Sequence, residues 1–169
     1  QTEVSNAGES EEASAVSDFL EATIDSLERM VHSSQRHIVL EMKAGLHSEL
    51  AERRLALATQ SAVAPAVAQS LGSAARRHLQ TSLKVFNDLH ASGQADLRAF
   101  SHAESLYGAA LCHHGSYTSG MKHFEKSIDI TAKHMQDRMH VSLIPKYYNA
   151  AMCMHQASQP EGVVKLLRR

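Results

Sequence analysis

The spacing of apolar residues constrains the fold of this chain more than any other feature. Apolar positions recur three or four residues apart in stretches around residues 20–31, 39–50, 71–86 and 100–111. In the first stretch they are Leu20, Ile24, Leu27 and Val31. This spacing places apolar side chains on one face of a helix. Because the 169 residues include only 3 Pro and 8 Gly, few positions can interrupt helices. The sequence therefore predicts an all-α protein.

Proline and glycine indicate where these helices begin and end. Pro65 and Pro145 suit the first turn of a helix, where the missing N–H is not needed. Gly93 and Gly115 suit the position just after a helix. A last helix is expected from Gln159 onward, cut off by the end of the chain. The result is about seven helices, arranged as antiparallel helical hairpins with short links.

The predicted organisation has three parts. Residues 1–9 show no apolar periodicity and are expected to form a disordered acidic tail, with a helix starting at Ser10. Residues 10–93 are expected to form helical hairpins. Residues 1–30 hold eight acidic residues against Arg29, whereas the remainder is net basic. This polarity fits either a solvated tail with an acidic first turn or an acidic arm that docks on a basic face.

The C-terminal part contains an internal repeat with an offset of 42 residues. Comparing 101–127 with 143–169 aligns four identical pairs, Ala109 with Ala151, His113 with His155, Ser116 with Ser158 and Gly120 with Gly162. The small residues Gly108 and Gly120 would let two helices approach closely, and Phe124 would fill the gap to the next hairpin. Since one hairpin cannot bury both of its faces, such hairpins stack.

At these residues the chain resembles a tetratricopeptide repeat protein of the long-helix variety, over about residues 97–169. The first copy matches the family pattern at Gly108, Gly115, Tyr117, Gly120, Phe124 and Ser127. A weaker second copy carries Ala150, Gly162 and Leu166. The resemblance implies a stacked α-solenoid over residues 94–169, with the last repeat truncated and residues 10–93 as a degenerate repeat or cap. It also implies a non-catalytic scaffold or adaptor that binds a partner peptide or helix in a groove, within a larger complex.

In this family the first helix of each repeat lines the concave surface where partner peptides lie. By resemblance, the candidate partner-binding residues are Glu104, Tyr107, His114, Lys146 and Asn149. A structural alternative is that at least one of the rings of Tyr147 and Tyr148 packs between helices. The apolar face of the last helix, with Val163 and Leu166, predicts further repeats or a covering neighbour, such as a second copy.

The cluster of Cys112, His113 and His114 suggests metal ligands, but consecutive helical residues point about 100° apart and cannot converge. His155 is explained by the duplication, and Cys153 aligns with Leu111 as a small core residue. We therefore expect no metal and no cofactor. Two cysteines do not make a disulfide framework, so an intracellular and cytoplasmic setting is the default.

No catalytic motif is present, so an enzyme is not expected. No apolar run is long enough to span a bilayer. Basic pairs at Arg53–Arg54 and Arg76–Arg77 offer an alternative function, an RNA-binding helical module or ribonucleoprotein subunit. Without a nucleic-acid motif or a platform of aromatic residues, these pairs are better explained as solvated helix faces.

Overall fold

The computed structural model describes residues 3–30, 36–136 and 140–158, and within these ranges all regular structure is helical. The elements are α1 (Glu3–Met30), α2 (Arg36–Ala58), α3 (Pro65–Ala91), α4 (Leu97–His113), α5 (Tyr117–Met135), the 3-10 helix η1 (Val141–Leu143) and α6 (Ile144–Gln156). The all-α class is confirmed. The seventh helix, expected from Gln159, lies outside the described residues.

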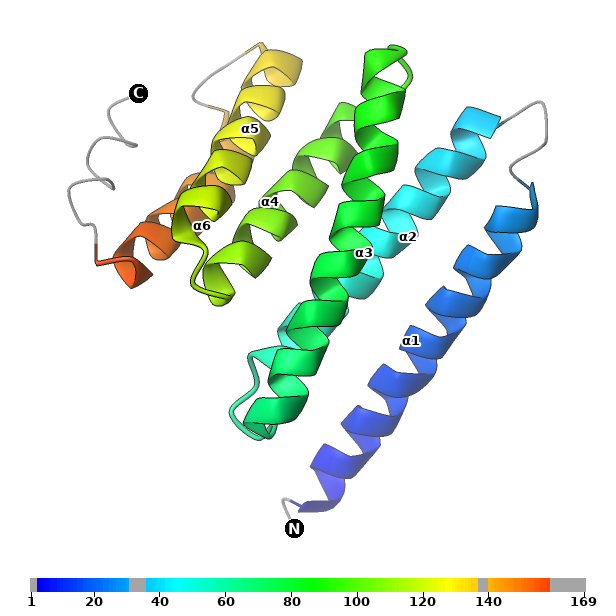
Figure 1. Ribbon diagram of the computed structural model, residues 1–169, viewed down its shortest axis with the longest axis vertical. Coiled ribbons are helices and arrows are strands. Elements are labelled where there is room, and N and C mark those ends of the chain that lie inside the picture. The colour runs from blue at the N-terminus through cyan, green and yellow to red at the C-terminus, as the bar shows by residue number, and fades with distance from the viewer. Residues whose placement is uncertain (1–2, 31–35, 137–139, 159–169) are drawn as a thin grey trace.

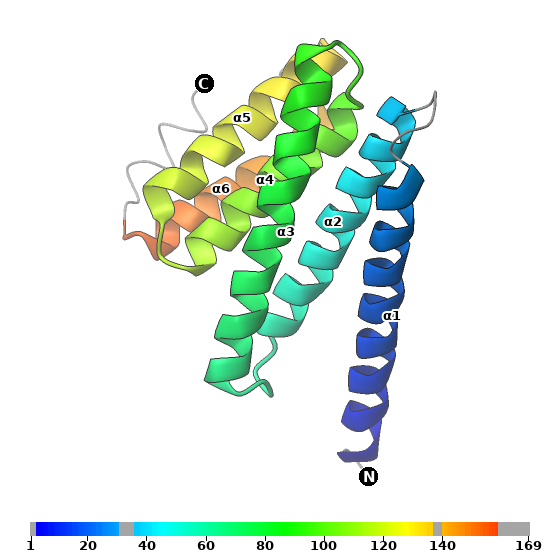
Figure 2. The ribbon, with the colours of Figure 1, turned by 45° about the vertical axis from the view of Figure 1, so that its right-hand side comes forward.

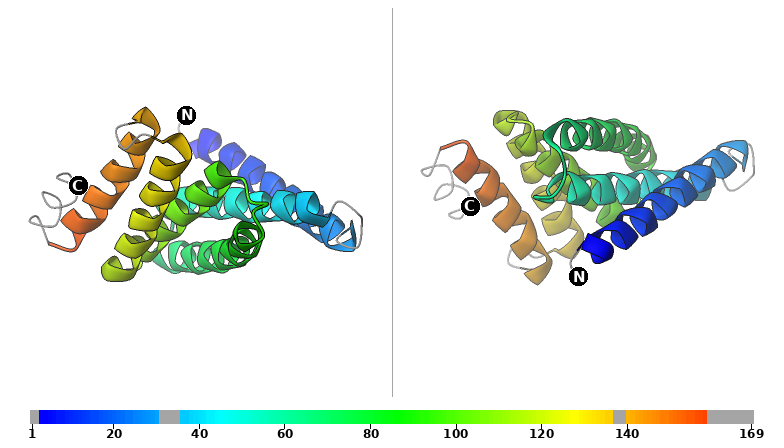
Figure 3. Two further views of the ribbon diagram at one scale, coloured as in Figure 1. Left: turned by 90° about the horizontal axis from the view of Figure 1, so that it is seen from above. Right: turned by 90° about the horizontal axis from the view of Figure 1, so that it is seen from below.

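The helices form a row with α1 at one edge and the α5–α6 pair at the other (Figure 1). Each of the six α-helices packs against the next one along the chain, and α4 also contacts α2 and α6. Helices α2, α4 and α6 therefore lie next to one another, with α3 and α5 covering them (Figure 3). Helix α1 lies along α2 (Figure 2), its one contact among the described elements. Helix α4 is consequently at the centre of the molecule.

The helix boundaries follow local chemistry. Helix α3 begins at Pro65, and Pro145 lies in the first turn of α6, as predicted. Gly93 and Gly115 have φ angles of +72° and +75°, which glycine adopts without strain. After α4, the Gly115 and Ser116 amides donate to the carbonyls of Cys112 and Leu111, both at 2.9 Å. These bonds reverse the chain and set α5 antiparallel to α4.

Helix α1 starts earlier than the sequence predicted. It begins at Glu3, so residues 3–9, expected to belong to a disordered tail, are helical. No proline interrupts this segment, and acidic residues near a helix N-terminus interact favourably with the helix dipole.

The close crossing expected at Gly108 and Gly120 is confirmed. A methyl group added to Gly108 would lie 3.0 Å from the Gly120 carbonyl oxygen and 3.2 Å from the Phe124 ring. One added to Gly120 would lie 2.8 Å from the Gly108 carbonyl oxygen. Phe124 is buried in a cluster with Leu143 and Ala150, between the α4–α5 hairpin and α6. Phe124 thus fills the space between the α4–α5 hairpin and α6, next to the crossing of the two glycines.

Helices α1, α2 and α3 meet around a partly buried histidine pair. The Nδ1 atoms of His47 and His78 lie 2.9 Å apart, and the Arg54 guanidinium lies 2.6 Å from Nε2 of His78. Arg54 also pairs with Glu21 on α1. Burial, followed by the neighbouring His78, lowers the pKa of His47 to about 4. The folded protein therefore holds His47 neutral at pH 7.

This lowered pKa predicts that mild acid destabilises the protein. The unfolded chain takes up a proton at His47 near its ordinary pKa of about 6.5, whereas the folded protein does so only near pH 4. The contribution of His47 is thus fully present above pH 6.5 and is lost as the pH falls toward 4. Urea unfolding at pH 7.0 and 5.0 should show this loss in the wild type and a smaller one in His47→Gln. Equal losses in both proteins would contradict the assignment.

Candidate functional site

A groove lies on α4, bordered by α2, α6 and the C-terminal turn of α5. It has a volume of about 610 Å³. Helix α4 contributes Arg98, His102, Ser105, Leu106 and Ala109. The other charged and titratable side chains on its wall are Glu52, His134, His140 and Lys146. Glu52 is already engaged by His102, with its carboxylate 3.1 Å from the imidazole Nε2. We call this 610 Å³ cavity, with Arg98 and Lys146 on its wall, the cationic half of the groove.

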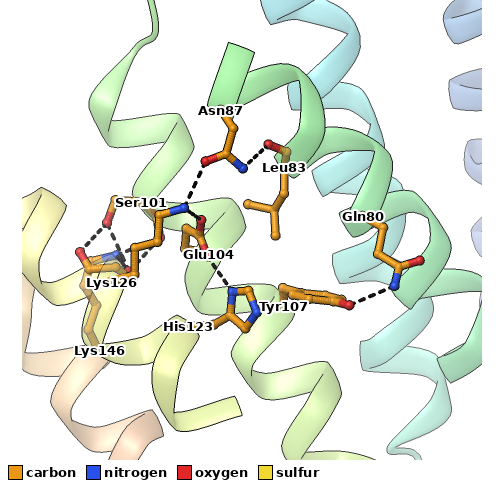
Figure 4. Close-up of polar contacts among 10 residues, drawn as sticks. Gln80, Leu83, Asn87, Ser101, Glu104, Tyr107, His123, Lys126 and Lys146 are labelled. Atoms are coloured by element: carbon orange, nitrogen blue, oxygen red, sulfur yellow. Dashed lines mark hydrogen bonds and ion pairs between the residues drawn. The ribbon is translucent and has the colours of Figure 1, made fainter. Parts of the chain in front are cut away.

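Lys146 is the most unusual side chain of the cationic half. Its ammonium donates a hydrogen bond to the Ser127 hydroxyl at 2.9 Å and lies 3.5 Å from the Ser101 carbonyl oxygen (Figure 4). Burial lowers the pKa of Lys146 to about 8. Among the described residues no carboxylate forms an ion pair with it. The groove therefore contains an ammonium group that has only neutral hydrogen-bond partners.

A seam of small hydroxyl residues between α4 and α5 creates this environment. The Ser101 hydroxyl donates to the Ser127 carbonyl at 2.8 Å, and the Ser127 hydroxyl lies 2.6 Å from the Ser101 carbonyl. Thr131 extends the seam, with its hydroxyl 2.6 Å from that of Ser101. Because these side chains are short, the two helices pack closely and Lys146 can reach the seam from α6.

A second hollow of about 230 Å³ continues the groove toward the C-terminal end of α4. Ala109 and Asn149 line both cavities, so the two adjoin each other at these residues. Leu55 of α2 and Met152 of α6 both line this hollow. We call it the apolar half of the groove. The exposed side chains of Tyr148 and Ile144 lie on α6 about one and two turns before Met152, and they extend the apolar surface.

Cys112 and Cys153 also line the apolar half, and they are joined in a disulfide with their Cα atoms 5.6 Å apart. This corrects the expectation that Cys153 is simply a small core thiol. Cys112 and Cys153 are not equivalent positions of the repeat, which aligns Cys153 with Leu111. They lie on α4 and α6, which contact each other directly. The bond fixes these two helices next to the groove.

Of the five residues predicted to bind a partner, the structure places Lys146 and Asn149 together in the groove. Glu104 lies elsewhere: its side chain is 1% exposed, on the face of α4 that packs against α5. Its carboxylate lies 2.6 Å from both the Lys126 ammonium and the His123 imidazole (Figure 4). A buried carboxylate with two cationic or hydrogen-bonding partners is a structural feature of this helix pair.

Tyr107 and His114 also lie outside the groove walls. The Tyr107 hydroxyl accepts a hydrogen bond from the Gln80 amide on α3 at 2.9 Å, and its ring meets that of His123 edge-on. His114 packs against Gly72 on α3, where its imidazole occupies the space of the missing side chain. Both residues thus connect the α4–α5 hairpin to α3.

Sequence reasoning missed Arg98 and His102, which join Lys146 in the groove. They precede Ala109 on the same face of α4 at helical spacing, and Asp96 caps this helix by accepting hydrogen bonds from the Arg98 and Ala99 amides. In the sequence, Arg98 and His102 form a polar stripe on the face of α4 opposite Glu104, and this stripe could have indicated the groove. In the part of the chain that the structure describes, no group of three His, Cys, Asp or Glu side chains could hold a metal ion.

Comparisons with protein-family models, with characterised proteins and with solved structures find no match to this chain. Within the described residues, no helix is both long and apolar enough to cross a membrane. Arguments about function therefore rest on the groove itself.

Proposed function

We propose that this protein is a non-catalytic scaffold that holds an extended segment of a partner protein in the groove on α4, as part of a larger complex. The observation that carries this proposal is that the cationic and apolar halves adjoin, since Ala109 and Asn149 line both. A side-chain amide such as that of Asn149 can both donate and accept hydrogen bonds, which suits the backbone of an extended peptide.

The chemistry of the two halves specifies the partner. The cationic half carries Arg98 and Lys146, while the carboxylate of Glu52 is engaged by His102. Among the described residues Lys146 has no carboxylate partner, and an acidic side chain of the bound protein would supply one. The apolar half would accept a leucine-sized side chain against Met152. We therefore propose a segment with Asp or Glu a few residues from an apolar anchor.

The tetratricopeptide resemblance supports the same proposal. By this resemblance α4 and α6 would be the first helices of their repeats, and residues of both line the groove together with Glu52 of α2. We propose that residues 94–169 form a tetratricopeptide-like solenoid. The C-terminal helix expected to carry a self-association surface lies outside the described residues.

A peptide array tests the proposed function. Ten-residue peptides pairing glutamate with leucine at several spacings should bind, whereas the same peptides with lysine in place of glutamate should not. Lys146→Gln keeps a hydrogen-bonding group near Ser127 but removes the charge. It should weaken binding of the best peptide by about 10-fold or more, the typical value of a charge-assisted hydrogen bond. Fluorescence anisotropy measures the affinities.

The matched control is Lys122→Gln, which removes the same charge from an exposed position of α5 that does not line the groove. It should bind the peptide as the wild type does. Equal weakening by both variants, or equal binding of the lysine peptides, would contradict the groove proposal.

The RNA-binding alternative has less support. Arg53 pairs with Glu49 at 2.9 Å, and Arg54 pairs with Glu21 while contacting His78. Both guanidinium groups thus have partners within the protein, which lowers the positive charge that phosphates could meet.

A further inference from the structure

Lys146 differs from the other lysines whose contacts the structure describes. Lys43 and Lys126 each form an ion pair, with Glu28 and Glu104 respectively. Lys146 instead meets the Ser127 hydroxyl and the Ser101 carbonyl oxygen, both uncharged. An ion pair stabilises the protonated amine, whereas burial does not. The surroundings of Lys146 therefore favour its neutral form more than the surroundings of Lys43 and Lys126 favour theirs.

The neutral amine is the nucleophilic form of lysine. With a pKa of about 8, roughly one tenth of the Lys146 side chains are neutral at pH 7. An exposed lysine with the ordinary pKa of about 10.4 has a neutral fraction on the order of 0.0004 at this pH. Lys146 therefore presents over a hundred times more nucleophile than a surface lysine under the same conditions.

The cavity beside Lys146 can admit a small molecule. Its volume of about 610 Å³ lies within the range of ligand pockets in proteins. The groups that face it are Arg98 and His102 from α4, His134 from α5, His140 before η1 and Glu52 from α2. Arg98 is cationic, and Glu52, the one carboxylate among these groups, is engaged by His102. The cavity should therefore favour reagents that carry a negative charge.

We propose that Lys146 is a covalent modification site for small aldehydes that carry an anionic group, which the cationic half of the groove holds while the amine forms an imine. The proposal does not depend on peptide binding, because it concerns the amine and the cavity of the free protein. A bound peptide would cover Lys146 and slow the reaction.

The chemical step needs no further reactant. The nitrogen lone pair of neutral Lys146 forms a bond to the carbonyl carbon, and one amine proton moves to the carbonyl oxygen to give a carbinolamine. The carbinolamine then loses its hydroxyl group together with the second amine proton, as one water molecule. The product is a C=N double bond between Lys146 and the aldehyde carbon, and no electrons are gained or lost.

Pyridoxal 5′-phosphate is a suitable probe, since it combines an aldehyde with a phosphate. The full chain is incubated with the probe at pH 7.5, borohydride reduces the imines to stable amines, and peptide mass spectrometry gives the labelling rate of each lysine. Lys146 should react at least 10-fold faster than exposed Lys122 and Lys133, with a rate that rises through a midpoint near pH 8. This comparison is internal to the wild-type protein and needs no variant to fold.

Two further measurements separate nucleophilicity from anion binding. Arg98→Gln should slow labelling of Lys146 by pyridoxal 5′-phosphate several-fold but leave labelling by pyridoxal, which lacks the phosphate, nearly unchanged. Equal labelling of Lys146 and Lys122, or a midpoint above pH 9.5, would overturn the proposal of a reactive amine. Equal effects of Arg98→Gln on both probes would overturn the anionic preference.

Discussion

Gly120→Ala is expected to lower the free energy of unfolding by about 1–2 kcal/mol. The added methyl group would overlap Cys112 Sγ and lie 2.8 Å from the Gly108 carbonyl oxygen. Neither can move easily, because one is part of a disulfide and the other belongs to helix backbone. Overpacking of this kind costs about 1–3 kcal/mol and occasionally more, and here it exceeds the gain of about 1 kcal/mol from replacing a helical glycine.

Gly45→Ala is the matched control. Gly45 also lies inside a helix, α2, but nothing lies within 4 Å of the position where its Cβ would be. The same substitution should therefore raise the free energy of unfolding there, by about 1 kcal/mol at most. Thermal unfolding followed by circular dichroism should move in opposite directions for the two variants. If both variants were stabilised, the close crossing of α4 and α5 would be wrong.

The features predicted correctly from sequence are those that depend on neighbours along the chain. Pro65, Gly93 and Gly115 mark helix ends because each acts on the backbone within a few residues. The crossing of Gly108 with Gly120 also lies within one hairpin, so the short turn at Gly115 brings the two glycines together. These local constraints do not require knowledge of the rest of the fold.

The groove was predictable only in part. Helix α4 contacts α2, α3, α5 and α6, so nearly every stripe of its surface meets another helix. Which stripe remains open depends on how all four neighbours pack, and a helical pattern alone does not contain that information. Glu104 and Tyr107 were consequently assigned to the groove although they face α5 and α3. Lys146 and Asn149 do line the groove, and α6, which carries them, has fewer neighbours among the described elements.

The disulfide was missed for a similar reason. The repeat aligns Cys153 with Leu111, one residue before Cys112, and so hides the pair. Only the side-by-side packing of α4 and α6 brings the two sulfurs together.

Removing this disulfide is expected to have the largest effect on stability. The bond joins residues 41 positions apart, and closing a loop of that length in the unfolded chain is worth about 4 kcal/mol in the chain-entropy account. Urea unfolding with and without dithiothreitol should show a loss of this order in the wild type. The double variant Cys112→Ala with Cys153→Ala should be destabilised without reductant and unaffected by it.

The position of the disulfide predicts which helix loses stability first when the bond is reduced. Helix α6 packs against α4, α5 and η1 among the described elements, and the disulfide is its covalent connection to α4. Amide hydrogen exchange should therefore accelerate after reduction in α6, while α2 and α3 keep their protection because their shared core around Ala75 and Leu79 does not involve the bond. Since residues Cys112 and Cys153 line the apolar half of the groove, reduction should also weaken the peptide complex.

Uniform acceleration of hydrogen exchange across all helices would instead mean that α6 unfolds only with the whole domain. An unchanged exchange pattern would show that packing around Phe124 and Leu143 holds α6 in place without the bond.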